Sequence, residues 1–274
     1  MQIENGPFGD SDRDHLNYGD FDHDGFSLTG KVALVNSSRA GICAESAHQL
    51  AAAGARVVVC GLNASQGNKT VAEIQRSGGQ ARFILTDVSM AVDVQAAIDE
   101  TIATFGRLDI LLNFASDDYE RDGSLLEVSE TAWDRIIETT LKGAFLCCQY
   151  ALPFLQQAGN GKIINLVEQT ASAQDRLVAS ICQGGVVAMT YAIAQQFSGQ
   201  SVSANLIWVI QPALAPSSIA PESLTRALEK ILYGPTTEDT DSPPFANAAE
   251  AISHLVSSAT NLHGHALVVN IACE

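Results

Sequence analysis

The sequence predicts a single α/β domain built on a parallel, doubly wound sheet, and three observations support this prediction. Short segments rich in β-branched residues recur along the chain, at residues 31–35, 55–60, 81–86, 108–113, 161–167, 203–209 and 265–270. Helical patterns separate most of them, near residues 42–53, 65–77, 91–105, 130–157 and 181–198. A length of 274 residues with 46% apolar residues suits one domain with a sizeable core.

Each element follows from its local pattern. The first two strand segments, KVALV (31–35) and ARVVVC (55–60), are almost continuously apolar, which is typical of strands buried on both faces of a parallel sheet. The later segments repeat this pattern, and the stretches between them have the length and composition of helices. Because the helices must cover both faces, seven strands in one series predict a Rossmann-type domain.

Two regions fall outside this alternation. Residues 1–26 are polar and acidic, and we expect a disordered extension there, followed by the folded domain at 27–274. The extension contains DFDHDG (20–25), which is similar to the first half of a calcium loop, but Lys31 stands where the last ligand should be a glutamate. A solvated acidic tail is the preferred interpretation. Residues 210–262 interrupt the pattern before the last strand and are expected to form a lid or a partner contact.

Composition also limits the partners. The formal net charge is −16, so nucleic acid is not an expected partner. No run of eighteen apolar residues occurs and the N-terminal residues do not resemble a secretory signal, so we expect no membrane partner and a cytoplasmic location. The six cysteines lack CxxC spacing and are expected to be buried thiols. The pair His263 and His265 has no acidic or cysteine companion, so no metal site is expected.

Several segments resemble the short-chain dehydrogenase/reductase family when taken in order. They are LTGKVALVNSSRAGICAESAHQL (28–50), LTDVS (85–89), GRLDILLNFAS (106–116), WDRIIETTLKGAFLCCQ (133–149), GKIINLV (161–167) and LHGHALVVN (262–270). The resemblance covers residues 26–272. It implies a nicotinamide-dependent oxidoreductase that binds a dinucleotide at the turn after the first strand.

The positions that the resemblance assigns to the dinucleotide are only partly kept. Of the glycines in the first turn, Gly41 remains. Asp87 stands where the family contacts adenine, and Asn113 keeps the first residue of the motif after the fourth strand. Gly61 ends the second strand where NAD-preferring members have an acid. We therefore expect no bound cofactor, with weak NAD(P) binding left open.

The positions that the resemblance assigns to catalysis are all changed. The family tyrosine and lysine fall on Ala179 and Gln183, the serine on Glu168 and the asparagine on Thr140. None of the five tyrosines has a lysine four residues later, and no lysine occurs between Lys162 and Lys230. An alanine cannot transfer the proton that a tyrosine would carry.

These substitutions predict a catalytically degenerate protein, a structural or regulatory subunit that assembles with an active paralogue. Two alternatives remain: a non-redox isomerase, lyase or cyclase that uses Glu168 as acid and base, or an atypical NAD(P)-dependent oxidoreductase. Residues 130–157 and 181–198 correspond to the helices through which the family dimerises, and their apolar faces predict a homo- or hetero-oligomer.

Overall fold

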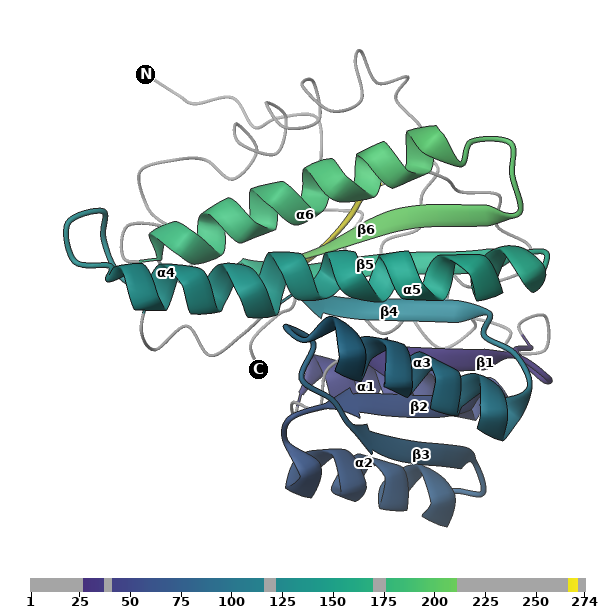
Figure 1. The fold of residues 1–274 in the computed structure, drawn as a ribbon. Coiled ribbons are helices and arrows are strands. Elements are labelled where there is room, and N and C mark those ends of the chain that lie inside the picture. Colours follow the sequence, from purple (N-terminus) through teal and green to yellow (C-terminus); the bar gives the residue numbers. More distant parts are fainter. Residues whose placement is uncertain (1–26, 37–40, 116–121, 170–175, 211–265, 271–274) are drawn as a thin grey trace, which may run out of the picture.

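The computed structural model contains one parallel sheet of seven strands in the order β3-β2-β1-β4-β5-β6-β7 (Figure 1). The structure describes residues 27–36, 41–115, 122–169, 176–210 and 266–270. Every pair of neighbouring strands is parallel. The order reverses between β1 and β4, as the predicted doubly wound fold requires.

The strands begin and end within two residues of the predicted segments. They are β1 (Val32–Asn36), β2 (Arg56–Gly61), β3 (Gln80–Leu85), β4 (Ile110–Ala115), β5 (Gly161–Gln169), β6 (Val202–Ile210) and β7 (Ala266–Asn270). The helices are α1 (Ile42–Ala52), α2 (Ala64–Arg76), α3 (Ala91–Phe105), α4 (Glu130–Ile136), α5 (Gly143–Gln157) and α6 (Leu177–Gln196), with a π-helix over Ile137–Lys142. The single α/β domain with a seven-stranded Rossmann-type sheet is confirmed.

One face of the sheet is covered by α1 and α2. Alternate residues of β1 such as Ala33 and Val35 pack there against Leu50 of α1 and Ile74 of α2. Burying such aliphatic side chains contributes about 1.5–3 kcal/mol each, so this layer is a main source of stability.

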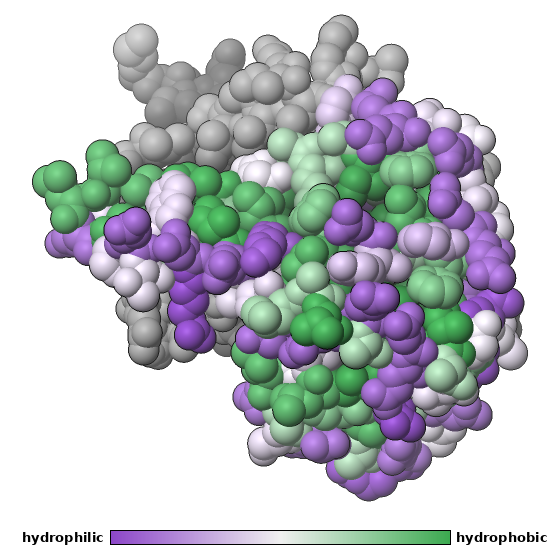
Figure 2. Space-filling view, in the orientation of Figure 1, coloured by the Kyte–Doolittle hydropathy of each residue, from purple (hydrophilic) through white to green (hydrophobic). Residues whose placement is uncertain are grey.

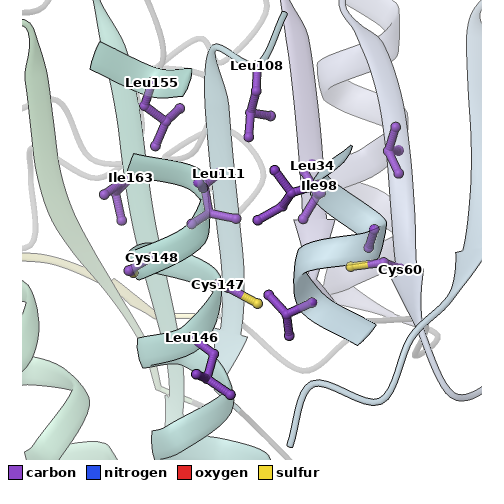
Figure 3. Close-up of a cluster of buried hydrophobic side chains, with 14 of the residues drawn as sticks. Leu34, Cys60, Ile98, Leu108, Leu111, Leu146, Cys147, Cys148, Leu155 and Ile163 are labelled. Carbon is purple, nitrogen blue, oxygen red and sulfur yellow. The ribbon is translucent and has the colours of Figure 1, made fainter. Parts of the chain in front are cut away.

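The opposite face is covered by α3, α5 and part of α6. Leu34 of β1 and Leu111 of β4 point into this second layer, together with Ile98 of α3 and Leu155 of α5 (Figure 3). Cys60, Cys147 and Cys148 belong to the same cluster, and all five cysteines in the described part of the chain are buried and free. The prediction of buried thiols is confirmed for these five residues, and Cys273 lies outside the described residues.

The predicted helix 130–157 is interrupted by the π-helix over Ile137–Lys142. A π turn adds one residue to a helical turn, and the spacing of apolar residues cannot reveal such an insertion. Directly after it, Gly143 packs against Val88, where an added Cβ would lie 2.8 Å from the valine Cγ2. The long helix therefore approaches the loop after β3 at a point that only glycine permits.

Helix α6 begins at Leu177, four residues before the predicted start at 181. By length and composition alone it is apolar enough to cross a membrane. It nevertheless packs beside β5, β6 and α5, and 44% of its most apolar 18-residue stretch is buried inside the domain (Figure 1). A core helix of an α/β domain accounts for this composition. The acidic extension 1–26, with its calcium-like loop, and nearly all of the insert 210–262 lie outside the described residues.

Candidate active site

The strand order reverses between β1 and β4, and α1 begins beside the carboxyl ends of these two strands. In doubly wound sheets, ligands bind at this position. Gly41, the residue before α1, has φ +76° and ψ −133°, a conformation that favours glycine. As a glycine it has no side chain to cap α1, and a Cβ added to it would meet nothing within 4 Å. The first amides of a helix are unpaired by the helix itself and attract anions.

This turn therefore fits the pyrophosphate of a dinucleotide. The end of β2 offers fewer polar contacts to a dinucleotide, because the strand ends in Gly61 and the neighbouring Leu62 is 59% exposed. No carboxylate stands at the end of β2 to bind ribose hydroxyls. Asp87 stands where the family contacts adenine. Its side chain is held in place by Ser89, because Asp87 Oδ1 accepts hydrogen bonds from the Ser89 amide (3.0 Å) and hydroxyl (2.7 Å).

Asn113 belongs to a buried row of asparagines that crosses the sheet. Asn36, Asn113 and Asn165 lie side by side on β1, β4 and β5. Asn36 donates to Asn113 at 3.4 Å, Asn113 donates to Asn165 at 2.9 Å, and Asn165 donates to the Thr190 hydroxyl at 2.8 Å. The Asn113 amide nitrogen also contacts Cys148 Sγ at 3.3 Å. The Asn113 side chain thus links β1, β4 and β5, and the row reaches α6 through Asn165.

Thr140 lies in the π-helix and is 2% exposed. Its hydroxyl has no hydrogen-bond partner among the residues that the structure describes. A buried hydroxyl without a partner costs about 1–3 kcal/mol, and π-helices are frequent at functional sites. Thr140 is therefore a candidate to contact a bound water or substrate.

Ala179 and Gln183 occupy successive turns of α6 and are both buried. Cys182 lies between them, with its thiol 3.8 Å from the carbonyl oxygen of Ile136, at the residue that precedes the π-helix. Burial raises the pKa of the Cys182 thiol to about 12, and the nearby Asp122 carboxylate adds to this. The thiol is therefore neutral at physiological pH and is not a nucleophile.

Glu168 lies near the carboxyl end of β5, opposite Val209 of β6. Its side chain lies outside the described part of the structure, so its predicted role remains a prediction. The backbone places it on the strand next to β4, at the same edge of the sheet as the α1 turn.

The sequence analysis missed Asp122, which caps the N-terminus of α6. Its carboxylate accepts hydrogen bonds from the amides of Val178 (3.1 Å) and Ala179 (2.8 Å). The residues that pair are 56 and 57 positions apart, so no local motif indicates the contact.

The fold and this edge define an α/β domain in which a helix N-terminus and polar strand ends lie at one edge of the sheet. The family model described as short chain dehydrogenase matches residues 31–219. The chain is 36% identical over 211 residues to the short chain dehydrogenase/reductase astE of Aspergillus oryzae, covering 75% of this chain and 77% of that one. It is 38% identical over 190 residues to the D-threitol dehydrogenase of Mycolicibacterium smegmatis, covering 69% and 71%. The chain belongs to the short-chain dehydrogenase/reductase family.

Solved structures agree with the fold. A dehydrogenase/reductase from Sinorhizobium meliloti superposes with a TM-score of 0.70 at 23% identity, covering 90% of this chain and 96% of that one.

These comparisons correct the functional prediction. The expected catalytically degenerate subunit is contradicted, because relatives that match over more than two thirds of both chains are named as dehydrogenases and reductases. They support the alternative of an oxidoreductase. The predicted loss of function rests on the changes at Thr140, Glu168, Ala179 and Gln183, whereas similarity over 69–75% of the chain to named dehydrogenases and reductases points to an oxidoreductase.

Proposed function

We propose that this protein is an atypical NAD(P)-dependent oxidoreductase that interconverts a small carbonyl compound and the corresponding alcohol. The observation that supports this most is the 36–38% identity to named dehydrogenases and reductases over most of both chains. The substrate class is carried over from those names, one of which is a sugar-alcohol dehydrogenase.

The α1 turn supports the cofactor part of this proposal. Gly41 and the backbone amides at the start of α1 would hold the pyrophosphate, and Asp87 would lie toward the adenine. Gly61 leaves the end of β2 without a carboxylate, so a 2′-phosphate would meet no repulsion there. A bound nicotinamide would supply or accept a hydride at the carboxyl edge of the sheet.

The remaining chemical requirement is one proton on the substrate oxygen. In the reducing direction the hydride goes to the carbonyl carbon, and an acid must give one proton to the oxygen. Ala179 has no proton to give, so another group must supply it. We assign this role to Glu168, an ionisable residue near the carboxyl end of β5, with the hydroxyl of Thr140 as a second polar contact.

The test is turnover by the isolated protein. Absorbance at the wavelength of reduced nicotinamide is followed with NADH and NADPH and a panel of small ketones, aldehydes and polyols. We expect measurable turnover, lowered about 100-fold or more in Glu168→Gln but not in Glu130→Gln, which removes an exposed carboxylate of α4. Absence of turnover with either cofactor across the panel would refute the oxidoreductase, and equal rates in the two variants would refute the role of Glu168.

We also propose that the protein assembles as a homo-oligomer through the outer faces of α5 and α6. The 15 residues of α5 and the 20 residues of α6 contain no Asp, Glu, Lys or Arg, although the whole chain has a net charge of −16. Two copies of so acidic a chain repel each other, and this uncharged face is where they can approach with least repulsion.

The same face is hollowed by a groove of about 300 Å³. Phe145, Cys148, Leu152, Met189, Ile193 and Phe197 are among its lining residues. At one end of this pair of helices, the turn before α4 exposes Leu125 (76%) and Leu126 (96%), and Figure 2 shows hydrophobic surface at this projecting end. A second copy of the chain is the occupant that this uncharged, apolar surface favours.

Light scattering after size-exclusion chromatography tests this assembly. Ala192→Glu places a charge in the groove and should give monomers, whereas Val92→Glu, at a 67% exposed position on α3, should not. A monomeric wild-type protein, or an Ala192→Glu oligomer unchanged in size, would contradict the proposal.

A further inference from the structure

Helix α6 lacks an N-terminal cap of its own. The residue before it, Arg176, has φ −140° and ψ 63° and makes no capping hydrogen bond with its side chain. The first amides of a helix must find acceptors elsewhere, and a buried amide without one is costly.

The acceptors come from the segment after β4. Asp122 Oδ1 accepts from the amide of Val178 at 3.1 Å, and Oδ2 accepts from the amide of Ala179 at 2.8 Å. The carbonyl oxygen of Gly123 accepts from the amide of Leu177 at 3.2 Å. The first three amides of α6 are thus all paired with Asp122 and Gly123, and the carboxylate also lies at the positive end of the helix dipole.

Beyond its first turn, α6 packs against the π-helix as well as against β5 and β6. The thiol of Cys182 lies 3.8 Å from the carbonyl oxygen of Ile136. One turn further, an added Cβ on Gly185 would lie 2.9 Å from Leu141 Cδ2, so the two helices are in close contact there. This contact fixes how far apart the helices lie, and Asp122 fixes where α6 begins.

We propose that Asp122 is a positioning residue of the proposed active site, acting through the first turn of α6. It holds the backbone at Ala179, and through it the buried side chains of Cys182 and Gln183, on the part of α6 that packs against the π-helix. The consequence for turnover rests on the proposed function, whereas the effect on α6 does not.

Three variants test this inference. Asp122→Ala removes both acceptor oxygens, and Asp122→Asn keeps one acceptor but loses the charge. Asp99→Ala is the matched control, because it removes an exposed carboxylate from α3.

Amide hydrogen exchange of Leu177, Val178 and Ala179 reports on the cap directly. We expect exchange about tenfold faster in Asp122→Ala, an intermediate rate in Asp122→Asn and no change in Asp99→Ala. Alkylation of Cys182, identified by peptide mass spectrometry, should accelerate in the same order, since this thiol is buried while the first turn is intact.

In the turnover assay we expect kcat/KM to fall about tenfold in Asp122→Ala and less in Asp122→Asn. The affinity for the nicotinamide cofactor should stay unchanged, because the proposed site of the cofactor pyrophosphate is at α1. Wild-type exchange at the three amides in Asp122→Ala would refute the cap. Faster exchange with kcat/KM equal to that of Asp99→Ala would refute the positioning role. If the wild-type protein turns over no substrate, the proposed function fails. Amide hydrogen exchange and the alkylation rate of Cys182 still decide whether Asp122 fixes the start of α6.

Discussion

The side-chain amide of Asn113 donates a hydrogen bond of 2.9 Å to the side-chain oxygen of Asn165, and both residues are fully buried. The pair joins β4 to β5 through side chains in addition to the backbone ladder. Asn165 passes the connection on to Thr190 of α6, whose hydroxyl donates to the carbonyl oxygen of Val186 at 2.7 Å. Sheet and helix are therefore linked by a continuous run of side-chain hydrogen bonds directly below the candidate site.

The first prediction concerns this pair. Asn113→Ala or Asn165→Ala should each lower the free energy of unfolding by about 2–4 kcal/mol, because each leaves buried amide groups without partners. The loss in the double variant should be smaller than the sum of the two single losses, by about 1 kcal/mol or more. Urea unfolding of the four proteins measures this coupling, and strict additivity would show that the two amides do not interact. Gln157→Ala, at an exposed position of α5, should change little.

Two buried threonines should respond in opposite ways to the loss of their hydroxyl groups. Thr140 and Thr190 are each 2% exposed, but only Thr190 has hydrogen-bond partners among the described residues. Thr190→Val should lose about 1–3 kcal/mol, whereas Thr140→Val should be neutral or gain about 1 kcal/mol, since it removes an unpaired polar group. Thermal unfolding measures both. A clear loss in Thr140→Val would mean that its hydroxyl is paired in solution, for example with a buried water.

The sequence predicted the strands well because each is a short, largely apolar run of the kind that parallel sheets contain. KVALV and ARVVVC, for example, became β1 and β2 with ends shifted by one residue. It did not predict the π-helix around Thr140, since a π segment of 6 residues inside a longer helix is too short to be located from the spacing of apolar residues. It also missed the cap on α6, because Asp122 and Ala179 are 57 positions apart and no local pattern indicates their contact.

The candidate site was predicted in part. The residues that the family resemblance assigned, including Gly41, Thr140 and Gln183, do lie on the turn and helices that surround one edge of the sheet. Asn113, which keeps the first residue of the family motif after the fourth strand, is buried, and its side-chain amide pairs with Asn165. The predicted loss of function was wrong, because the absence of four side chains is a local observation, whereas the likeness to dehydrogenases extends along most of the chain.

A further prediction follows from the packing of α2 on β3. A Cβ on Gly67 would lie 2.2 Å from Phe83 Cδ2, which is far inside van der Waals contact. Gly67→Ala should therefore cost about 1–3 kcal/mol despite the better helix propensity of alanine. Phe83→Leu in the same chain should recover part of this loss by making room for the methyl group. The urea midpoints of wild type and of the single and double variants measure these losses. A Gly67→Ala protein as stable as wild type would mean that the Phe83 ring moves aside freely.

The last prediction concerns Asp109, whose carboxylate is almost fully buried near the start of β4. Burial opposes its ionisation, but hydrogen bonds from Arg107, the Val32 amide and Lys31 outweigh burial and hold the pKa of this carboxyl below its ordinary value of 3.8. A lowered pKa in the folded state means that the ionised group stabilises the fold above the pKa of the unfolded chain, and that this stability is lost as pH falls through the folded pKa.

Asp109→Asn should therefore cost about 1–3 kcal/mol at pH 7, and the difference from wild type should shrink below about pH 4. Urea unfolding at a series of pH values measures it, with Asp99→Asn on the exposed face of α3 as the control. A difference between Asp109→Asn and wild type that stayed constant from pH 7 to pH 3 would show that the charge of Asp109 does not contribute, and that the variant acts through packing alone.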